Sequence, residues 1–154
     1  MQIVYFVIVL SFALSISIED LKIHKIRNRK LLYFLASLVI FSVLLPNAHM
    51  DPISGVSFFA IFTALYLLSN AFNKAGGFGF ADVKLISVLA LAFFDTGLRS
   101  VEIFFISLWL ALVAHICLHL LIYRKFPHRI AMAPDIFLAS GLYLYAPIAL
   151  LLPQ

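Results

Sequence analysis

The chain has 154 residues, of which 64% are hydrophobic and only 12% are charged. Soluble domains carry roughly 45–50% apolar and about 25% charged residues, so a soluble protein of this size could not bury so much apolar surface. The composition therefore predicts an integral membrane protein. The net charge of +4 does not indicate a nucleic-acid-binding protein, because the cations lie in short loops between apolar runs. That distribution is typical of membrane orientation.

Six apolar segments approach the length of about 20 residues that a helix needs to cross a bilayer. They are Ile3 to Ile18, Leu31 to Leu45, Ile53 to Phe72, Val83 to Phe94, Val101 to Tyr123 and Pro134 to Leu152, of which the second and fourth are short. We therefore predict an all-α, polytopic bundle of six transmembrane helices in a single membrane-embedded domain, residues 1–154. No positive charge precedes the first segment and no small-x-small cleavage site follows it, which favours an uncleaved span.

The cations are distributed asymmetrically over such a bundle. Apart from Arg99, every Lys and Arg falls on one side, and the loops of the opposite side carry Asp51, Asp95 and Glu102. Loops rich in Lys and Arg stay in the cytoplasm. The distribution therefore supports an even number of spans, with both termini outside the cytoplasm.

Three further sets of residues in apolar segments could suggest other sites. Cys117 is the single cysteine, so neither an intrachain disulfide nor a multi-cysteine zinc site can form. His115 and His119 share a helix face at spacing i, i+4, but they lack a metal-binding pattern such as HExxH, and we expect a polar contact between helices. Asp135 is either a helix N-terminal charge or a contributor to substrate binding. No metal or other cofactor is expected.

Asp20 and Asp82 stand out because ionisable residues within or beside a span are costly and are functional candidates by default. Asp20 ends the first apolar segment and Asp82 precedes the fourth. Three glycines precede Asp82, namely Gly76, Gly77 and Gly79. Backbone without side chains can approach another chain closely, so this loop is a plausible place for an extended peptide.

The segment GGFGFADVKLISVLAL resembles the loop of the GxGD aspartic proteases, in the branch of the type IV prepilin peptidases. That family has G-x-G-D followed by one residue and then Lys. Gly79, Asp82 and Lys84 keep the pattern, whereas Ala81 replaces the glycine before the aspartate. If the backbone at that position has a positive φ, alanine would be strained there.

Two further segments resemble the same family. Asp20 is followed, at the family's spacing for Ile-Pro-Asn, by Ile26-Arg27-Asn28, in which Arg27 replaces the proline. The segment IAMAPDIFLASGLYL resembles the signature of the last span, in which Ala133 and Pro134 open the helix and Gly141 follows within it. The three matches occur in the family's order and span most of the chain.

The resemblance implies a membrane aspartic endopeptidase that removes the leader peptide from prepilin-like precursors at the cytoplasmic face. It implies Asp20 and Asp82 as the catalytic residues, with a substrate-binding set of Gly77, Gly79, Ala81, Lys84 and Asn28. The chain is similar to the short six-span form associated with tight-adherence (Flp-type) pili. The cytoplasmic region with paired cysteines of the longer form is missing, so no methyltransferase activity is expected.

The resemblance also implies a multi-pass protein of a bacterial or archaeal cytoplasmic membrane. Its partners would be a prepilin precursor and membrane lipid, and no nucleic acid. The oligomeric state and the identity of the pilin are left open.

Two neighbouring carboxyls suit peptide hydrolysis because they cannot easily both ionise and so share a proton. The ionised member takes a proton from the attacking water, and the neutral member donates a hydrogen bond to the scissile carbonyl oxygen. Such a pair titrates as a unit, so neither role is assigned to Asp20 or Asp82. Glu19 is excluded from the pair because it points to a different helix face.

Two alternatives remain. One is a catalytically inactive relative that binds pilins as an assembly factor, which is motivated by Ala81. The other is a small ion or proton transporter that uses Asp20 and Asp82. The position of both aspartates at the membrane edge, away from mid-span, disfavours the transporter.

Overall fold

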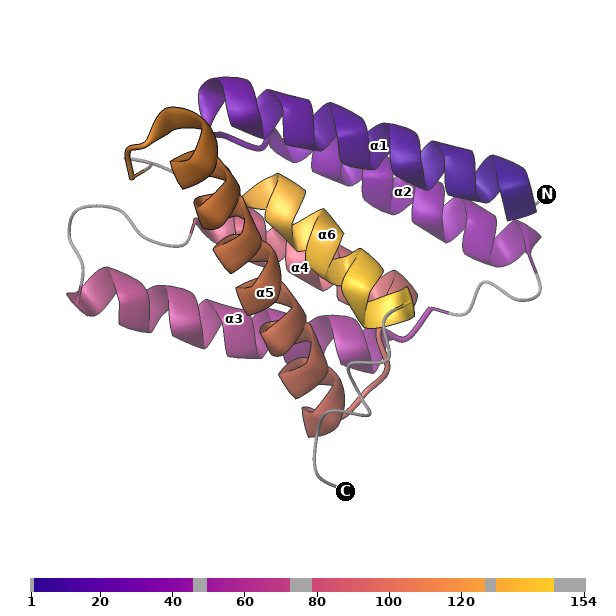
Figure 1. Ribbon diagram of the computed structural model, residues 1–154. Coiled ribbons are helices and arrows are strands. Elements are labelled where there is room, and N and C mark those ends of the chain that lie inside the picture. Colours follow the sequence, from indigo (N-terminus) through magenta and orange to yellow (C-terminus); the bar gives the residue numbers. More distant parts are fainter. Residues whose placement is uncertain (1, 46–49, 73–78, 127–129, 146–154) are drawn as a thin grey trace.

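The computed structural model describes residues 2–45, 50–72, 79–126 and 130–145 and consists of six α-helices (Figure 1). The helices are α1 (Gln2–Ile23), α2 (Asn28–Leu44), α3 (Pro52–Phe72), α4 (Phe80–Phe93), α5 (Leu98–Tyr123) and α6 (Met132–Tyr145). No strand occurs in the described ranges. The all-α prediction is confirmed, and each helix overlaps one of the six apolar segments.

Three helices within the described residues are long and apolar enough to cross a bilayer, namely α1 over Ile3–Ile23, α3 and α5. Helices α2, α4 and α6 have 17, 14 and 14 residues. At about 1.5 Å per residue they are shorter than a hydrocarbon core of roughly 30 Å. The last part of the sixth apolar segment, residues 146–152, lies outside the described residues. The arrangement of six spans with both termini outside the cytoplasm therefore stays a prediction.

Helices α4 and α6 occupy the centre of the bundle (Figure 1). Helix α4 packs against α2, α3 and α6, and α6 packs against α1, α4 and α5. The largest fully buried side chains come from all six helices and include Ile16, Phe34, Phe58, Leu89, Phe104 and Ile136. Because other helices cover α4 on several sides, five of its apolar side chains are buried, namely Val83, Leu85, Ile86, Leu89 and Ala90.

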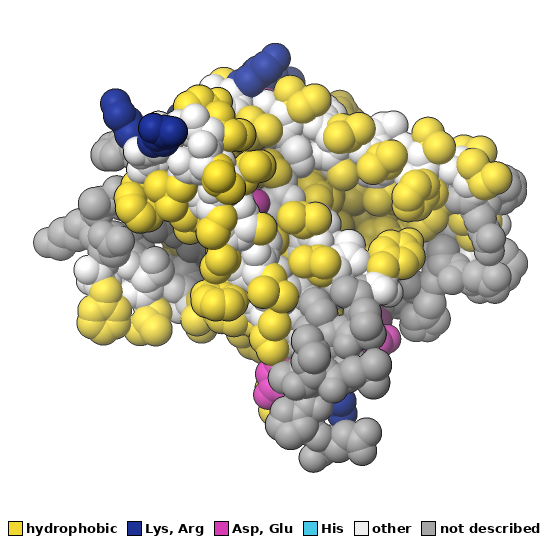
Figure 2. Space-filling model, viewed as in Figure 1, with side chains coloured by type: hydrophobic (Ala, Val, Ile, Leu, Met, Phe, Trp, Pro, Cys, Tyr) yellow, Lys and Arg dark blue, Asp and Glu magenta, His cyan; other side chains and the backbone are white. Residues whose placement is uncertain are grey.

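The outer helices expose large hydrophobic side chains. Ile3 is 79% exposed, Trp109 is 61% exposed and Leu121 is 79% exposed. Figure 2 shows hydrophobic side chains over most of one face, with most of the visible Lys and Arg at one end. Soluble monomers rarely expose apolar patches of this extent, so the outer surface is suited to contact with acyl chains.

Contacts between helix ends bring the cations to one end of the bundle. The C-terminal parts of α1 and α5 meet the N-terminus of α6, and the N-terminus of α2 meets that of α4. This cationic end carries Lys22, Lys25, Arg27, Arg29, Lys30, Lys84, Arg124 and Lys125, whereas Lys74 and Arg129 lie outside the described residues. The opposite end carries the loop between α4 and α5, where the Thr96 hydroxyl donates to Asp51.

Candidate active site

Asp20 lies near the C-terminal end of α1, and its side chain is directed toward α6. The residue is only 5% exposed, and its Oδ2 accepts a hydrogen bond of 2.9 Å from the backbone N–H of Ala133. The first N–H groups of a helix have no partner within the helix and carry its positive dipole end. The start of α6 therefore provides a fixed donor for the Asp20 carboxylate. Pro134 suits this first turn because its missing N–H leaves no helix bond unmade.

Asp82 lies in the first turn of α4, just before the buried apolar run of that helix. Its Oδ2 accepts a hydrogen bond of 3.0 Å from the backbone N–H of Gly79, the residue that caps the helix in an extended conformation. A Cβ atom at Gly79 would lie 2.8 Å from that same oxygen. A side chain at this position would therefore force the Asp82 carboxylate to shift, because the carboxylate occupies the volume that the Cβ atom would fill.

The two carboxyl groups interact electrostatically. Burial raises the pKa of Asp82 to about 7, the Gly79 hydrogen bond opposes this rise, and the charge of Asp20 adds to it. Asp20 and Asp82 are separated by more than sixty residues in the sequence, yet α1 and α4 both pack against α6. The structure thus brings the two predicted catalytic residues into one electrostatically coupled group at the cationic end.

A comparison with known protein families places this group in context. Residues 7–119 match the type IV leader peptidase family, and this range includes Asp20, Asp82, Asn28 and Lys84. The chain belongs to the type IV leader peptidase family. The predicted resemblance is confirmed at the level of the family. No curated protein and no solved structure matched the chain.

Ala81, the departure from the GxGD pattern, fits the backbone of this family member without strain. It lies in the first turn of α4 and is half-buried against the core. Among the described non-glycine residues, only His24 and Arg124 have a positive φ. The condition under which alanine would be strained is therefore not met.

Arg27, the other departure, keeps a backbone that proline could adopt. Its φ is −73° and its ψ is 126° at the N-cap of α2, and the φ lies within the range fixed by a proline ring. The side chain adds an ion pair with Glu19, at 2.7 Å between Nε and Oε1. Glu19 thus faces α2 while its neighbour Asp20 faces α6, so the prediction that the two side chains point to different helix faces is confirmed.

Lys84 and Asn28, predicted to contact substrate, lie together. The Lys84 Nζ donates to Oδ1 of Asn28 at 3.3 Å and lies 5.1 Å from the ring centroid of Phe80. Both residues line a groove of about 300 Å³ whose other lining residues are Leu31, Leu32, Leu35, Phe59, Ser87 and Val88. The groove is apolar with one polar end. Gly77, the remaining predicted substrate-binding residue, lies outside the described residues.

A third carboxyl group, that of Asp135, interacts with Asp20. The sequence left open whether Asp135 is a helix N-terminal charge or contributes to substrate binding. Both oxygens of Asp135 lie 2.9 Å from Nδ1 of His115, and the Asp135 side chain is 4% exposed. Asp20 acts electrostatically on Asp135 as it does on Asp82. The polar contact between helices expected for His115 is present, and its partner is the carboxylate at the start of α6. The family match ends before Asp135.

The signal for this pair was present in the sequence, because two ionisable residues in apolar segments need partners. That these two residues are each other's partners could not be predicted, because it depends on how α5 packs on α6. The described residues contain no group of three His, Cys, Asp or Glu side chains that could hold a metal ion.

Proposed function

We propose that the chain is an aspartic endopeptidase that cleaves the leader peptide of prepilin-like precursors at the cytoplasmic face of the membrane. The observation that carries the proposal is the coupling of two carboxyl groups, Asp20 and Asp82, each held by one backbone amide. Membership of a peptidase family supports the reaction class.

The hydrogen bonds of Asp20 and Asp82 would allow the two carboxyl groups to act together on a substrate. Both backbone hydrogen bonds use Oδ2. Oδ1 of each residue has no hydrogen-bond partner in the part of the chain that the structure describes, and it would serve water, substrate or the other carboxyl group. A pKa of about 7 for Asp82 means that the pair can hold one proton near neutral pH. The ionised member then accepts a proton from the attacking water, and the protonated member donates to the scissile carbonyl oxygen.

The substrate proposed is a small pilin precursor with a basic leader beside a hydrophobic helix. The groove with Asn28 and Lys84 at its polar end would receive the start of that helix, since its remaining lining is largely apolar. The backbone near the cut would lie along the glycine-rich entry to α4, where Gly79 presents no side chain.

The inactive-relative alternative loses its main motivation, because Ala81 occupies helical backbone. The transporter alternative has no specific support, because Asp20 and Asp82 both lie at a helix end.

The test is cleavage of a co-expressed prepilin, scored by gel shift, for wild type, Asp20→Asn and Asp82→Asn. Asp95→Asn is the matched control, because Asp95 is an exposed carboxylate at the opposite end of the bundle. We expect wild type and the control to cleave and the other two variants to remain in the membrane without cleaving. Cleavage by either site variant at the wild-type rate would exclude the two-aspartate mechanism.

A further inference from the structure

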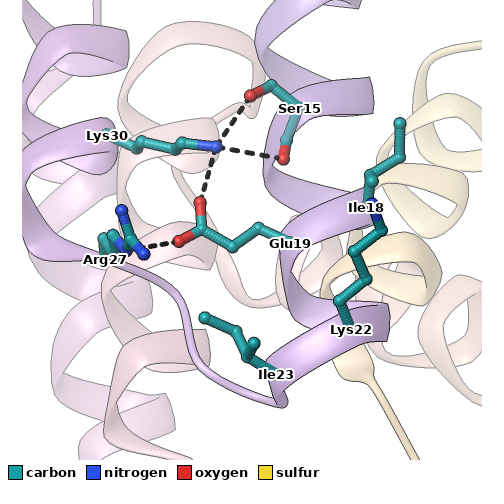
Figure 3. A pocket seen from close by; sticks show the side chains of 7 residues that line it. All are labelled: Ser15, Ile18, Glu19, Lys22, Ile23, Arg27 and Lys30. Carbon is teal, nitrogen blue, oxygen red and sulfur yellow. Dashed lines mark hydrogen bonds and ion pairs between the residues drawn. The ribbon is translucent and has the colours of Figure 1, made fainter.

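A second hollow lies beside the proposed catalytic group, between the end of α1 and the start of α2 (Figure 3). This α1–α2 pocket has a volume of about 580 Å³. Its lining residues are Ser15, Ile18, Glu19, Lys22, Ile23, Arg27 and Lys30. The family resemblance and the proposed catalytic mechanism use none of these side chains.

The charges of the pocket are arranged around one nearly buried carboxylate. Glu19 is 11% exposed and pairs with Arg27 at 2.7 Å and with Lys30 at 2.5 Å. Lys30 also donates to the Ser15 hydroxyl at 2.9 Å. These contacts fix the directions of two cations, as the dashed lines in Figure 3 show. Glu19 therefore holds the side chains of Arg27 and Lys30 in place.

The cationic charge of the pocket exceeds what Glu19 neutralises. Lys22 adds a third cation, and no carboxylate among the described residues pairs with it. The ion pair of Arg27 uses Nε, while 70% of its side chain stays exposed. A guanidinium fork can bind an oxyanion through its remaining donors. The pocket is therefore suited to an anion.

Two lining residues of the pocket, both from α1, are apolar. Ile18 is 49% exposed and Ile23 is 46% exposed. They continue the exposed hydrophobic surface of a helix long enough to span a bilayer. A ligand with a charged phosphate and acyl chains satisfies both parts of the pocket, since the phosphate would meet Arg27 and Lys22 while the chains follow α1.

We propose that the α1–α2 pocket binds the phosphate group of an anionic phospholipid. The site joins the end of α1, which carries Asp20, to the start of α2, which carries Asn28. Binding there stabilises the relative placement of these helices. The proposal does not depend on the peptidase reaction, because the ligand touches neither Asp20 nor Asp82.

The test uses the full chain in detergent, titrated with phosphatidylglycerol and followed by native mass spectrometry, with phosphatidylcholine as the zwitterionic comparison. Each cation near a membrane surface contributes about fivefold to the binding of anionic lipid. We expect Lys22→Gln to weaken phosphatidylglycerol binding about fivefold and Lys22→Gln/Arg27→Gln at least about tenfold. Lys22→Gln breaks no ion pair among the described residues, so this variant keeps the fold.

The matched control is Arg124→Gln/Lys125→Gln, which removes one Arg and one Lys from the same end of the bundle but away from the pocket. It should change binding by less than about twofold if the pocket, and not general surface charge, holds the lipid. Equal losses in the control and the pocket variants would overturn the proposal. A second measurement compares the melting temperature of the full chain with each ligand. A rise with inorganic phosphate equal to the rise with phosphatidylglycerol would also overturn the proposal, because the ligand would then be free phosphate.

Discussion

The Oδ2 atom of Asp82 lies 3.0 Å from the backbone nitrogen of Gly79 and occupies the space that a side chain at residue 79 would need. The carboxylate and the glycine are therefore one structural unit. A Cβ atom at residue 79 would move the Asp82 carboxylate from the position in which this hydrogen bond holds it.

Replacement of Gly79 by alanine should displace the Asp82 carboxylate. Loss of a hydrogen bond to a charged group costs about 1.5–3 kcal/mol, so we expect prepilin cleavage to fall roughly tenfold to a hundredfold. Ala81→Gly is the matched control on the other side of the motif. It should leave the cleavage rate nearly unchanged, because helical backbone at residue 81 does not require glycine. A Gly79→Ala variant with full activity would show that the position of the Asp82 carboxylate does not depend on glycine at residue 79.

The Asp20 contact with Ala133 predicts different effects of two substitutions at residue 20. Asn keeps an oxygen that accepts the Ala133 N–H, whereas Ala leaves that buried donor without a partner. An unsatisfied buried donor costs about 1–3 kcal/mol. Both variants should lose cleavage, but only Asp20→Ala should also lose thermal stability, as measured by a melting curve in detergent. Equal melting temperatures for the two variants would show that the Ala133 contact does not stabilise the fold.

Much of this arrangement could be predicted from the sequence, and the missing parts have a common cause. The apolar runs identified all six helices, and the cost of ionisable residues at a span edge identified Asp20 and Asp82. The hydrogen bond from the Ala133 N–H to Asp20 could not be predicted, because every residue except proline has a backbone N–H and the sequence does not show which one lies near Asp20. The pairing of His115 with Asp135 likewise depends on how α5 packs against α6, which apolar periodicity does not determine.

Asp82 also predicts how stability depends on pH. Its pKa rises from 3.8 to about 7 on folding, chiefly through burial, so the folded state holds a proton that the unfolded state releases in this range. The stabilisation is complete below about pH 4 and is lost as the pH rises to about 7. Asp82→Asn should remove this slope and be more stable than wild type at pH 8. Parallel melting temperatures of both proteins between pH 4 and 8 would contradict the assignment.

The ionisation of Asp82 also sets an upper pH limit for prepilin cleavage. Above about pH 7, the pKa of Asp82, the Asp82 carboxyl loses its proton, so we expect the rate of prepilin cleavage to decline on the alkaline side. The measurement is the initial rate across pH at saturating substrate. A rate that stays constant to pH 9 would mean that no proton held by the pair is needed.

His115 and Asp135 should behave as a coupled pair. Loss of the partner of a buried polar group costs about 1–3 kcal/mol, and more for a charged group, whereas replacing both partners by apolar residues can be nearly neutral. We expect His115→Leu to destabilise the protein strongly and His115→Leu/Asp135→Leu to recover most of the loss. A double-mutant cycle of unfolding free energies measures the coupling, and additive effects would indicate that the contact is not energetically important.

The position of Lys84 in the groove, in contact with Asn28, predicts that its substitution changes KM and leaves kcat nearly unchanged. Lys84 lines the groove without touching either aspartate in the described contacts, and its aliphatic stem lies beside Phe80. Lys84→Met keeps that stem and removes the charge and the hydrogen bond to Asn28. If the groove receives the precursor, KM should rise several-fold while kcat changes little, because the lost interaction is made equally in the bound substrate and the transition state. Ser69→Ala, a change in α3 away from the groove, is the control. A fall in kcat at unchanged KM would instead place Lys84 in the chemical step, as a positioning residue for Asp82.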